Sequence, residues 1–271
     1  MLLHLIADFG PNDLAFAEVI QRFKLFMPEA EPVVTPVPPF ATLAAGFCAA
    51  QLALNDAPPG TVVFHNVAPR QDEAAARRNN DGERLACARL PNGVVVVGVN
   101  AGYAFSFLKD EALELAFVNV ASSGSQFRSR DLFAAACAAV VRGEPGALAE
   151  GLEPATVPDA PEGVVAYIDG FGNLKTTLDK LPAAEKLDVT IGSVTRAVVV
   201  ANSSFSVPQG ELCLSVGSSG WRRRDGEQVR WCELFLRGGS AWEAFGRPPV
   251  GARLELSQTF PSPTSYVPSD F

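Results

Sequence analysis

The stretch VVVVGVN, residues 94–100, decides the fold class of this chain. Its β-branched side chains favour a strand, and because apolar residues occupy both alternating sets of positions, neither face of that strand suits water. Strands of this kind are typical of parallel sheets that helices cover on both sides. We therefore predict an α/β domain with a doubly wound, mainly parallel sheet around residues 94–100.

The segments around this strand alternate between extended and helical patterns. LLHLIA at 2–7 is a continuous apolar run, and residues 12–26 then place apolar side chains at helical spacing, which predicts strand, turn and helix. The alternation continues along the N-terminal half. The other predicted elements are strands at EPVVTPVPP (31–39), TVVFHNV (61–67) and 112–120, and helices at 40–54 and 131–142.

The composition changes between about residues 143 and 163, where Gly, Pro and acidic residues dominate as they do in linkers. Short strand-like runs separated by turns follow, which predicts a smaller, β-rich and barrel-like domain. These runs are GVVAYID (163–169), LDVTIG (187–192), RAVVVAN (196–202), ELCLSVG (211–217), WCELFLR (231–237) and ARLELS (252–257). We predict an α/β domain at 1–150, a linker at 151–163, a β-rich domain at 164–271, and a loosely ordered Pro/Ser-rich tail.

Composition excludes several classes of protein. Of the 271 residues, 48% are hydrophobic and 19% charged, which is not the composition of a disordered chain. The net charge of −8 disfavours nucleic acid and anionic membrane surfaces as partners. Five scattered cysteines without a CxxC pair favour buried thiols in a reducing compartment over disulfides or a zinc site, so we expect a cytoplasmic protein without a metal.

Polar residues near two predicted helix starts are candidates for a site. Asp8 follows the first strand, where a carboxylate either caps the helix or accepts hydrogen bonds from a vicinal diol such as a ribose. Asp13 lies in the first helical turn, where negative charge is favoured whatever the function. In SSGSQFRSRDLF (122–133), Arg128 and Ser129 belong either to a plain helix entry or to a site.

The C-terminal half offers turn-like motifs. IDGFGNLKTTL (168–178) reads either as an ordinary hairpin turn or as a loop that presents Phe171 between two glycines. GSSG (217–220) and RGGSA (237–241) are predicted to be loops that can lie against a flat ligand. WRRRDGEQVRW (221–231) is typical of an extended hairpin tip with solvated arginines. Of the two histidines, His4 reads as a satisfied core residue and His65 is ambiguous.

Taken in order, these segments resemble the S-adenosylmethionine (SAM) hydroxide adenosyltransferases and the related fluorinases and chlorinases. The matching pieces are ADFGPND (7–13), PPF (38–40), QFRSRDLF (126–133), IDGFGNLKTTL (168–178), SSFSVPQGELCLSVGSSG (203–220) and RGGSAWEAFG (237–246). They occur in the family's order over nearly the whole chain.

The resemblance implies a homotrimer in which one subunit's N-terminal domain and its neighbour's C-terminal domain hold SAM, with no cofactor beyond this substrate. It also implies roles for individual residues. Asp8 would bind the ribose hydroxyls, and Phe40 would pack near the ribose and adenine. Asp13 and Asp169 would bind the methionine ammonium, while Phe127 and Ser129 would border the reacting carbon. Ser219 would contact the substrate from the GSSG segment, and adenine would be bound by Phe171, Asn173, Phe205, Arg237 and Gly239.

The implied reaction is displacement of methionine from C5′ of SAM, but the sequence departs from the family at the water-activating residues. The family's aspartate and histidine positions fall on Ala68 and Arg128, neither of which can act as a base, and its arginine position falls near Arg77 or Arg78. Three outcomes remain open. Asn66 and Arg128 orient water for hydrolysis, Arg128 favours an anionic nucleophile such as halide, or the protein binds an adenosyl ligand without turnover.

Overall fold

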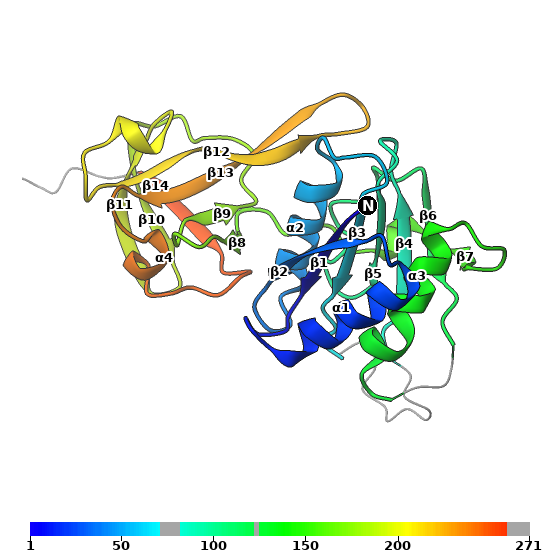
Figure 1. Cartoon of the computed structure of the whole chain (residues 1–271). Coiled ribbons are helices and arrows are strands. Elements are labelled where there is room, and N and C mark those ends of the chain that lie inside the picture. Colours follow the sequence, from blue (N-terminus) through cyan, green and yellow to red (C-terminus); the bar gives the residue numbers. More distant parts are fainter. Residues whose placement is uncertain (71–81, 122–124, 259–271) are drawn as a thin grey trace, which may run out of the picture. The chain divides into compact units, whose positions relative to one another are not determined.

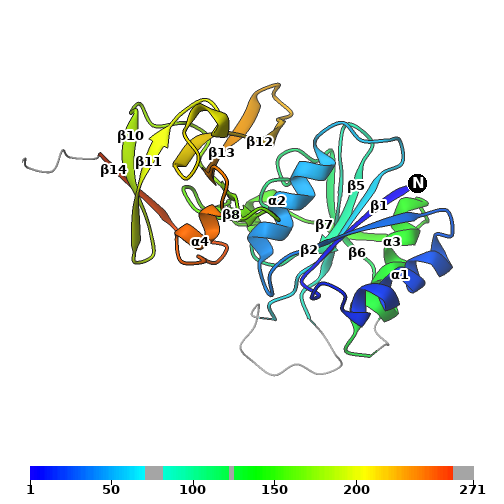
Figure 2. The same ribbon diagram turned by 60° about the vertical axis from the view of Figure 1, so that its left-hand side comes forward.

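The computed structural model describes residues 1–70, 82–121 and 125–258. The chain forms two compact units, drawn in Figures 1 and 2. Of the described residues, the first unit holds those up to 161 together with 219–230, and the second holds 162–218 and 231–258. No helix within the described ranges is long and apolar enough to cross a bilayer.

A seven-stranded sheet forms the centre of the first unit, in the order β2-β1-β3-β5-β4-β6-β7. Its strands are β1 (Leu2–Ala7), β2 (Glu31–Pro36), β3 (Val62–Asn66), β4 (Leu85–Arg89), β5 (Val95–Val99), β6 (Glu114–Val118) and β7 (Leu148–Gly151). The neighbouring strands β2, β1, β3 and β5 pair in parallel. By contrast, β4 is antiparallel to both β5 and β6, and β7 is antiparallel to β6. The predicted α/β class is confirmed, with a sheet that is only partly parallel.

Helices cover both faces of this sheet. Figures 1 and 2 show α1 (Leu14–Phe26) and α3 (Ala134–Val141) together on one side and α2 (Thr42–Ala53) on the other. Side chains that alternate along β1 and β3 account for this arrangement, because Leu3 and Phe64 belong to the buried cluster that also contains Phe23 of α1. The expected helix at 131–142 begins instead as a π-helix at Ser129–Phe133 and continues as α3.

The second unit is a β-rich half-barrel, and its strands follow the predicted runs. Its sheet has the order β14-β10-β11-β12-β13-β9-β8. The strands are β8 (Val165–Ile168), β9 (Leu174–Thr176), β10 (Lys186–Ile191), β11 (Val194–Val200), β12 (Leu212–Arg222), β13 (Gln228–Leu236) and β14 (Leu254–Gln258), and the short helix α4 (Ala241–Ala244) follows β13. Among the described strands of this unit, β9 had no predicted counterpart as a separate strand, because it contributes just three residues after a turn.

The expected loop at GSSG is wrong, because residues 217–220 lie inside the long strand β12. Their small size serves packing between strands. A Cβ atom on Gly217 would stand 2.5 Å from Cγ of Glu233, and one on Gly220 would stand 2.1 Å from the carbonyl oxygen of Val229. Glycine is therefore required at both positions by close approach of neighbouring chain segments.

The tip of the β12–β13 hairpin, residues 219–230, packs within the first unit. The ring of Trp221 lies 5.9 Å from that of Phe47 and 5.4 Å from that of Phe107. At Gly220 the backbone N–H donates to the side chain of Gln51, and the carbonyl oxygen accepts from Asn55 at the end of α2. A hairpin was predicted at this position, with solvated arginines at its tip. The structure adds a buried tryptophan, Trp221, that anchors the tip.

Candidate functional site

The first cluster of candidate residues lies where β1, β2 and β3 end. Asp8 follows β1, Phe40 follows β2, and Asn66 is the last residue of β3, paired in register with Ala7. An Oδ2 atom of Asp8 accepts a hydrogen bond from the backbone N–H of Phe40 at 3.0 Å. Of the two alternatives for Asp8, the helix cap is wrong, because Asp13 is the N-cap of α1 and accepts from the backbone N–H of Ala15 at 2.8 Å.

Phe40 has an unusual backbone for a bulky residue. Its φ is +61°, in the left-handed region, and 61% of the residue is exposed. Such a conformation is strained for a side chain with Cβ and persists only where neighbouring groups hold it. The bond from Phe40 to Asp8 is one such restraint, so the carboxylate and the exposed ring are presented together.

Asp8 also has a perturbed acidity. Burial raises the pKa of this carboxyl, and the Phe40 N–H together with the positive charge of Arg70 oppose that rise. Further hydrogen-bond donors would stabilise the ionised form of this half-buried carboxyl. Two vicinal hydroxyls are donors of the required kind.

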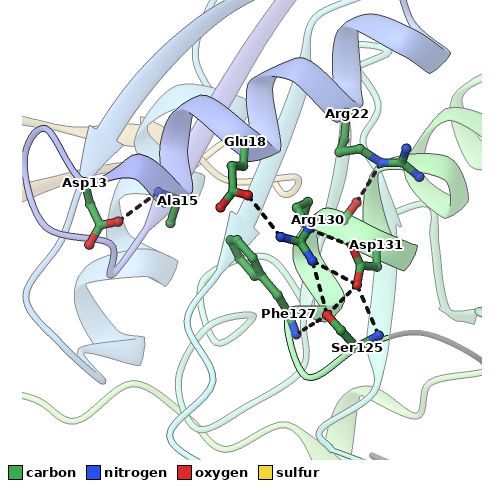
Figure 3. A network of polar contacts seen from close by, with 8 residues as sticks. All are labelled: Asp13, Ala15, Glu18, Arg22, Ser125, Phe127, Arg130 and Asp131. Atoms are coloured by element: carbon green, nitrogen blue, oxygen red, sulfur yellow. Dashed lines mark hydrogen bonds and ion pairs between the residues drawn. The ribbon is translucent and has the colours of Figure 1, made fainter.

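A polar network connects α1 with the segment that carries Phe127 (Figure 3). The guanidinium of Arg130 contacts Glu18 of α1 at 3.0 Å and Asp131 at 2.7 Å, and it also donates to the Ser125 hydroxyl. These contacts hold the pKa of Asp131 well below its usual range and raise the pKa of Arg130. The same guanidinium lies 5.0 Å from the centre of the Phe127 ring.

Phe127 is thereby fixed between charged and aromatic neighbours. Its ring meets that of Phe9 edge-on at 5.8 Å, which brings it to the residue after Asp8. Ser129 is buried, with 3% of the residue exposed, at the start of the π-helix. Single π-turns of this kind occur often at functional sites.

Arg128 does not present a base at this edge. Its Nη1 atom donates to the carbonyl oxygen of Glu83 at 3.1 Å, and its guanidinium lies 4.9 Å from the centre of the Phe133 ring. Ala68 packs against the apolar cluster of the first unit. Arg77 and Arg78, the expected equivalents of the family's arginine, lie outside the described residues.

Glu83 is a further acidic residue at this edge that the sequence reasoning missed. It lies two residues before β4, whose first residue pairs with the last residue of the parallel strand β5. It is 5% exposed, and its carboxylate accepts the backbone N–H of Arg70. The signal was hidden because β4, LACAR, has too few β-branched residues to be recognised as a strand.

The second cluster lies within the second unit and begins with the turn between β8 and β9. Oδ1 of Asp169 accepts the backbone N–H groups of Phe171 at 2.9 Å and Asn173 at 3.0 Å, while Oδ2 accepts Nδ2 of Asn173 at 3.0 Å. The carboxylate therefore shapes the turn. The Phe171 ring projects outward, with 82% of the residue exposed.

The segment between β13 and α4 joins this turn to the region around Phe205. The backbone N–H of Trp242 donates to the carbonyl oxygen of Gly172 at 2.8 Å. On the other side, Arg237 donates to the Val207 carbonyl oxygen at 2.6 Å, and its guanidinium lies 5.9 Å from the centre of the Phe205 ring. Phe205 is 82% exposed, as Phe171 is.

The structure thus groups the candidate residues into two clusters. Asp8, Phe40, Asn66, Phe127 and Ser129 gather in the first unit, with Asp13 at the start of α1. Asp169, Phe171, Asn173, Phe205, Arg237 and Gly239 gather in the second. Ser219 stands apart from the second group, because it is buried in β12 and belongs to the first unit.

Each cluster offers its own binding chemistry. In the first unit, the carboxylate of Asp8 is an acceptor beside the exposed Phe40 ring. In the second unit, the exposed rings of Phe171 and Phe205 offer stacking, and Asp169 offers an acceptor. Within the described part of the chain, no three His, Cys, Asp or Glu side chains are arranged to hold a metal ion.

The fold defines a protein with a mixed α/β N-terminal unit and a β-rich C-terminal half-barrel unit. Residues 163–223 match the family model described as "SAM hydroxide adenosyltransferase C-terminal domain". These residues therefore resemble the C-terminal domain of the SAM hydroxide adenosyltransferase family, and the predicted resemblance is confirmed over this range.

Solved structures support the fold alone. An uncharacterized conserved protein from Thermotoga maritima is 20% identical, with a TM-score of 0.72 over 94% of this chain and 99% of the other. A conserved hypothetical protein from Thermus thermophilus is 24% identical, with a TM-score of 0.64 over 94% and 98%. No curated protein matches the sequence.

Proposed function

We propose that this protein binds SAM and hydrolyses it to adenosine and methionine. The observation that carries the proposal is the Asp8–Phe40 pair at the carboxyl end of the parallel strands, in a chain whose C-terminal domain is that of the SAM hydroxide adenosyltransferases. A carboxylate in such a crevice is suited to a ribose diol.

The bond changes are simple. The oxygen of water forms a bond to C5′, the C5′–S bond breaks, and its electron pair stays on sulfur as neutral methionine. The attacking water loses one proton, which passes to the surrounding solvent. Because a sulfonium is a good leaving group, the protein contributes chiefly by aligning the water behind C5′ and removing bulk solvent.

Hydrolysis then requires groups that orient water without the family's aspartate and histidine. Asn66 has an amide that can accept and donate, and Arg128 has guanidinium donors. We include buried Glu83 in this proposal, because its carboxylate lies at the same edge of the sheet and its backbone already holds Arg128. These residues are proposed to replace the missing pair.

A second candidate function is adenosyl binding without turnover. It is favoured by the contacts of Arg128, whose guanidinium is engaged by Glu83 and Phe133, and by Ala68, which packs on the apolar cluster. Under this alternative the binding residues persist and the reaction is lost. In a variant of the first function, an anionic nucleophile such as halide, attracted by Arg128, attacks C5′ in place of water.

One assay separates these functions. Purified protein is incubated with SAM, with and without added chloride or fluoride, and adenosine, 5′-halogenated adenosine and methionine are measured by chromatography against a heat-inactivated control. Adenosine and methionine in equal amounts support hydrolysis. A thermal shift with SAM but no product supports binding alone, and neither shift nor product rejects both functions.

The assembly belongs to the same proposal. We propose a homotrimer in which the first cluster of one subunit and the second cluster of its neighbour bind the same ligand. Sedimentation or light scattering of the purified protein tests the trimer directly.

A further inference from the structure

The second unit contains a largely buried ion pair behind the Asp169 turn. Lys175 on β9 and Glu233 on β13 are paired in register across antiparallel strands. The Nζ atom of Lys175 lies 2.5 Å from Oε1 of Glu233, and the two side chains are only 13% and 2% exposed. Burying both charges carries a desolvation penalty that their attraction has to offset, so stability alone is a weak explanation for the pair.

The neighbouring strand makes room for this pair. The side chain of Glu233 lies against Gly217 of β12, where a Cβ atom would approach its Cγ and Cδ to 2.5 Å and its Oε1 to 2.6 Å. The glycine in the GSSG segment therefore accommodates the carboxylate of Glu233. The position of that carboxylate is fixed on both sides of β13.

Lys175 also faces the turn that carries the candidate ligand residues. Its Nζ atom lies 3.9 Å from Oδ2 of Asp169, farther than from Glu233. Asp169 has about four acceptor positions, and the N–H groups of Phe171 and Asn173 together use three of them. Among the described residues, one acceptor position on Oδ2 has no hydrogen-bond donor and is open to a further one.

The charges of the three side chains do not cancel. One lysine stands between two carboxylates, and its shorter contact goes to Glu233. The turn therefore keeps about one unit of negative charge, centred on Asp169. Without the charge of Glu233, the lysine would compensate Asp169 instead.

We propose that the Lys175–Glu233 pair determines ligand specificity: because Glu233 compensates the charge of Lys175, the negative charge of Asp169 remains available to the ligand, and ligands that carry an ammonium group are selected. This inference rests on the proposed function, because SAM has an ammonium group and adenosine has none. Lys175 and Glu233 act through Asp169 and are positioning residues. The pair sets the preference for SAM over adenosine, whereas the aromatic residues Phe171 and Phe205 serve both ligands alike.

The test uses two variants with opposite expected signs. In Glu233→Gln the lysine neutralises Asp169, so the affinity for SAM falls about ten-fold while that for adenosine stays within about two-fold. In Lys175→Met the positive charge is removed, so the ratio of SAM to adenosine affinity rises. Calorimetric titration of both ligands gives the two affinities for each variant.

Two controls keep the result specific. Glu243→Gln removes one negative charge from an exposed ion pair with Arg247 in the same unit and should change neither affinity. The double variant Lys175→Met/Glu233→Gln leaves Asp169 as the one charge of the three and should recover most of the wild-type preference. Circular dichroism tests whether each variant is folded. If one single variant is unfolded, the other still shows whether the ratio of SAM to adenosine affinity changes in the expected direction.

The outcomes are distinguishable. Equal losses for SAM and adenosine, or no change in either, overturn the charge-selection proposal while SAM binding by the wild type still supports the proposed function. Failure of the wild type to bind both ligands rejects the proposed function and this inference with it.

Discussion

The carboxylate of Asp8 and the backbone N–H of Phe40 are joined by a hydrogen bond of 3.0 Å, at a residue whose φ is +61°. A non-glycine residue in this conformation costs on the order of 1–2 kcal/mol. The bond links the end of β1 to the start of α2, so the orientation of the exposed Phe40 ring depends on Asp8. One acidic side chain thus combines a structural task with the proposed ribose contact.

Replacing Asp8 tests this double role. We expect Asp8→Ala to abolish the rise in melting temperature that adenosine causes, because both the ribose acceptor and the restraint on Phe40 are lost. Asp13→Ala is the matched control, since it removes the N-cap of α1 at a cost of about 1 kcal/mol and leaves the ribose contact. An unchanged adenosine shift in Asp8→Ala would remove Asp8 from the site.

The acidity of Asp8 predicts a pH dependence of binding. Burial raises the pKa of this carboxyl above 3.8 in the free protein, and ribose hydroxyls donate to its ionised form. Bound ligand therefore lowers the pKa, and the affinity for adenosine falls as the pH drops through the raised pKa of the free protein. Titrations from about pH 4 to about pH 7 should show this fall in the wild type and not in Asp8→Asn.

His65 predicts a separate pH effect, on stability. Burial lowers its pKa from 6.5 to about 3, and its ring packs on Phe105 at 4.9 Å with neither nitrogen hydrogen-bonded within the described residues. The unfolded chain takes up a proton below pH 6.5 that the folded protein refuses until about pH 3. Stability from this residue is thus complete above about pH 6.5 and falls as the pH drops, by about 2 kcal/mol at about pH 5.

His65→Phe removes this proton uptake while keeping a flat ring against Gly98. We expect the free energy of unfolding, measured in urea at about pH 5 and about pH 7, to differ less in the variant than in the wild type. A difference as large as that of the wild type would assign the acid sensitivity to other groups.

Arg130 predicts an effect on turnover with little effect on stability. Its contacts to Glu18 and Asp131 are partly exposed and contribute little to stability, but the same guanidinium lies against the Phe127 ring. Arg130→Met should therefore lower SAM turnover about ten-fold or more through misplacement of Phe127. Arg142→Met, which breaks an exposed pair with Glu144, should leave turnover unchanged. Equal activity of the two variants would contradict a positioning role for Arg130.

The fold was predictable wherever a segment was long and strongly patterned. VVVVGVN became β5 and the β-rich runs became the strands of the second unit, because β-branched residues and turn signals leave little choice. LACAR and LKT became strands only through pairing with their neighbours, which no local pattern reports. The GSSG segment was wrongly predicted to be a loop for a related reason. Its glycines are required because Glu233 and Val229 on the next strand approach them too closely for a Cβ atom.

The candidate site was predictable as a set of residues but not as a set of contacts. Local signals and the family resemblance pointed to Asp8, Phe40 and Asp169, yet the bond from Phe40 to Asp8 joins residues 32 positions apart. Glu83 and the Lys175–Glu233 pair escaped notice because their significance lies in burial and cross-strand register. Both properties arise only when the sheet is assembled.

The last prediction concerns Ala68 and Arg128, the two positions at which this chain departs from the pattern of the family that it resembles. Introducing Ala68→Asp together with Arg128→His should restore a carboxylate and a titratable imidazole beside the proposed C5′ position. General-base assistance contributes about 10²–10⁴-fold in favourable geometry, so we expect SAM hydrolysis to rise by at least about ten-fold. The loss of Arg128 also removes its bond to the Glu83 carbonyl oxygen and its contact with Phe133. Adenosine affinity therefore serves as the control for an intact site, and both single variants are measured beside the double one. A fall in turnover at unchanged adenosine affinity would identify Ala68 and Arg128 as parts of a different working arrangement, in which Glu83 and Asn66 orient the water with Arg128 in place.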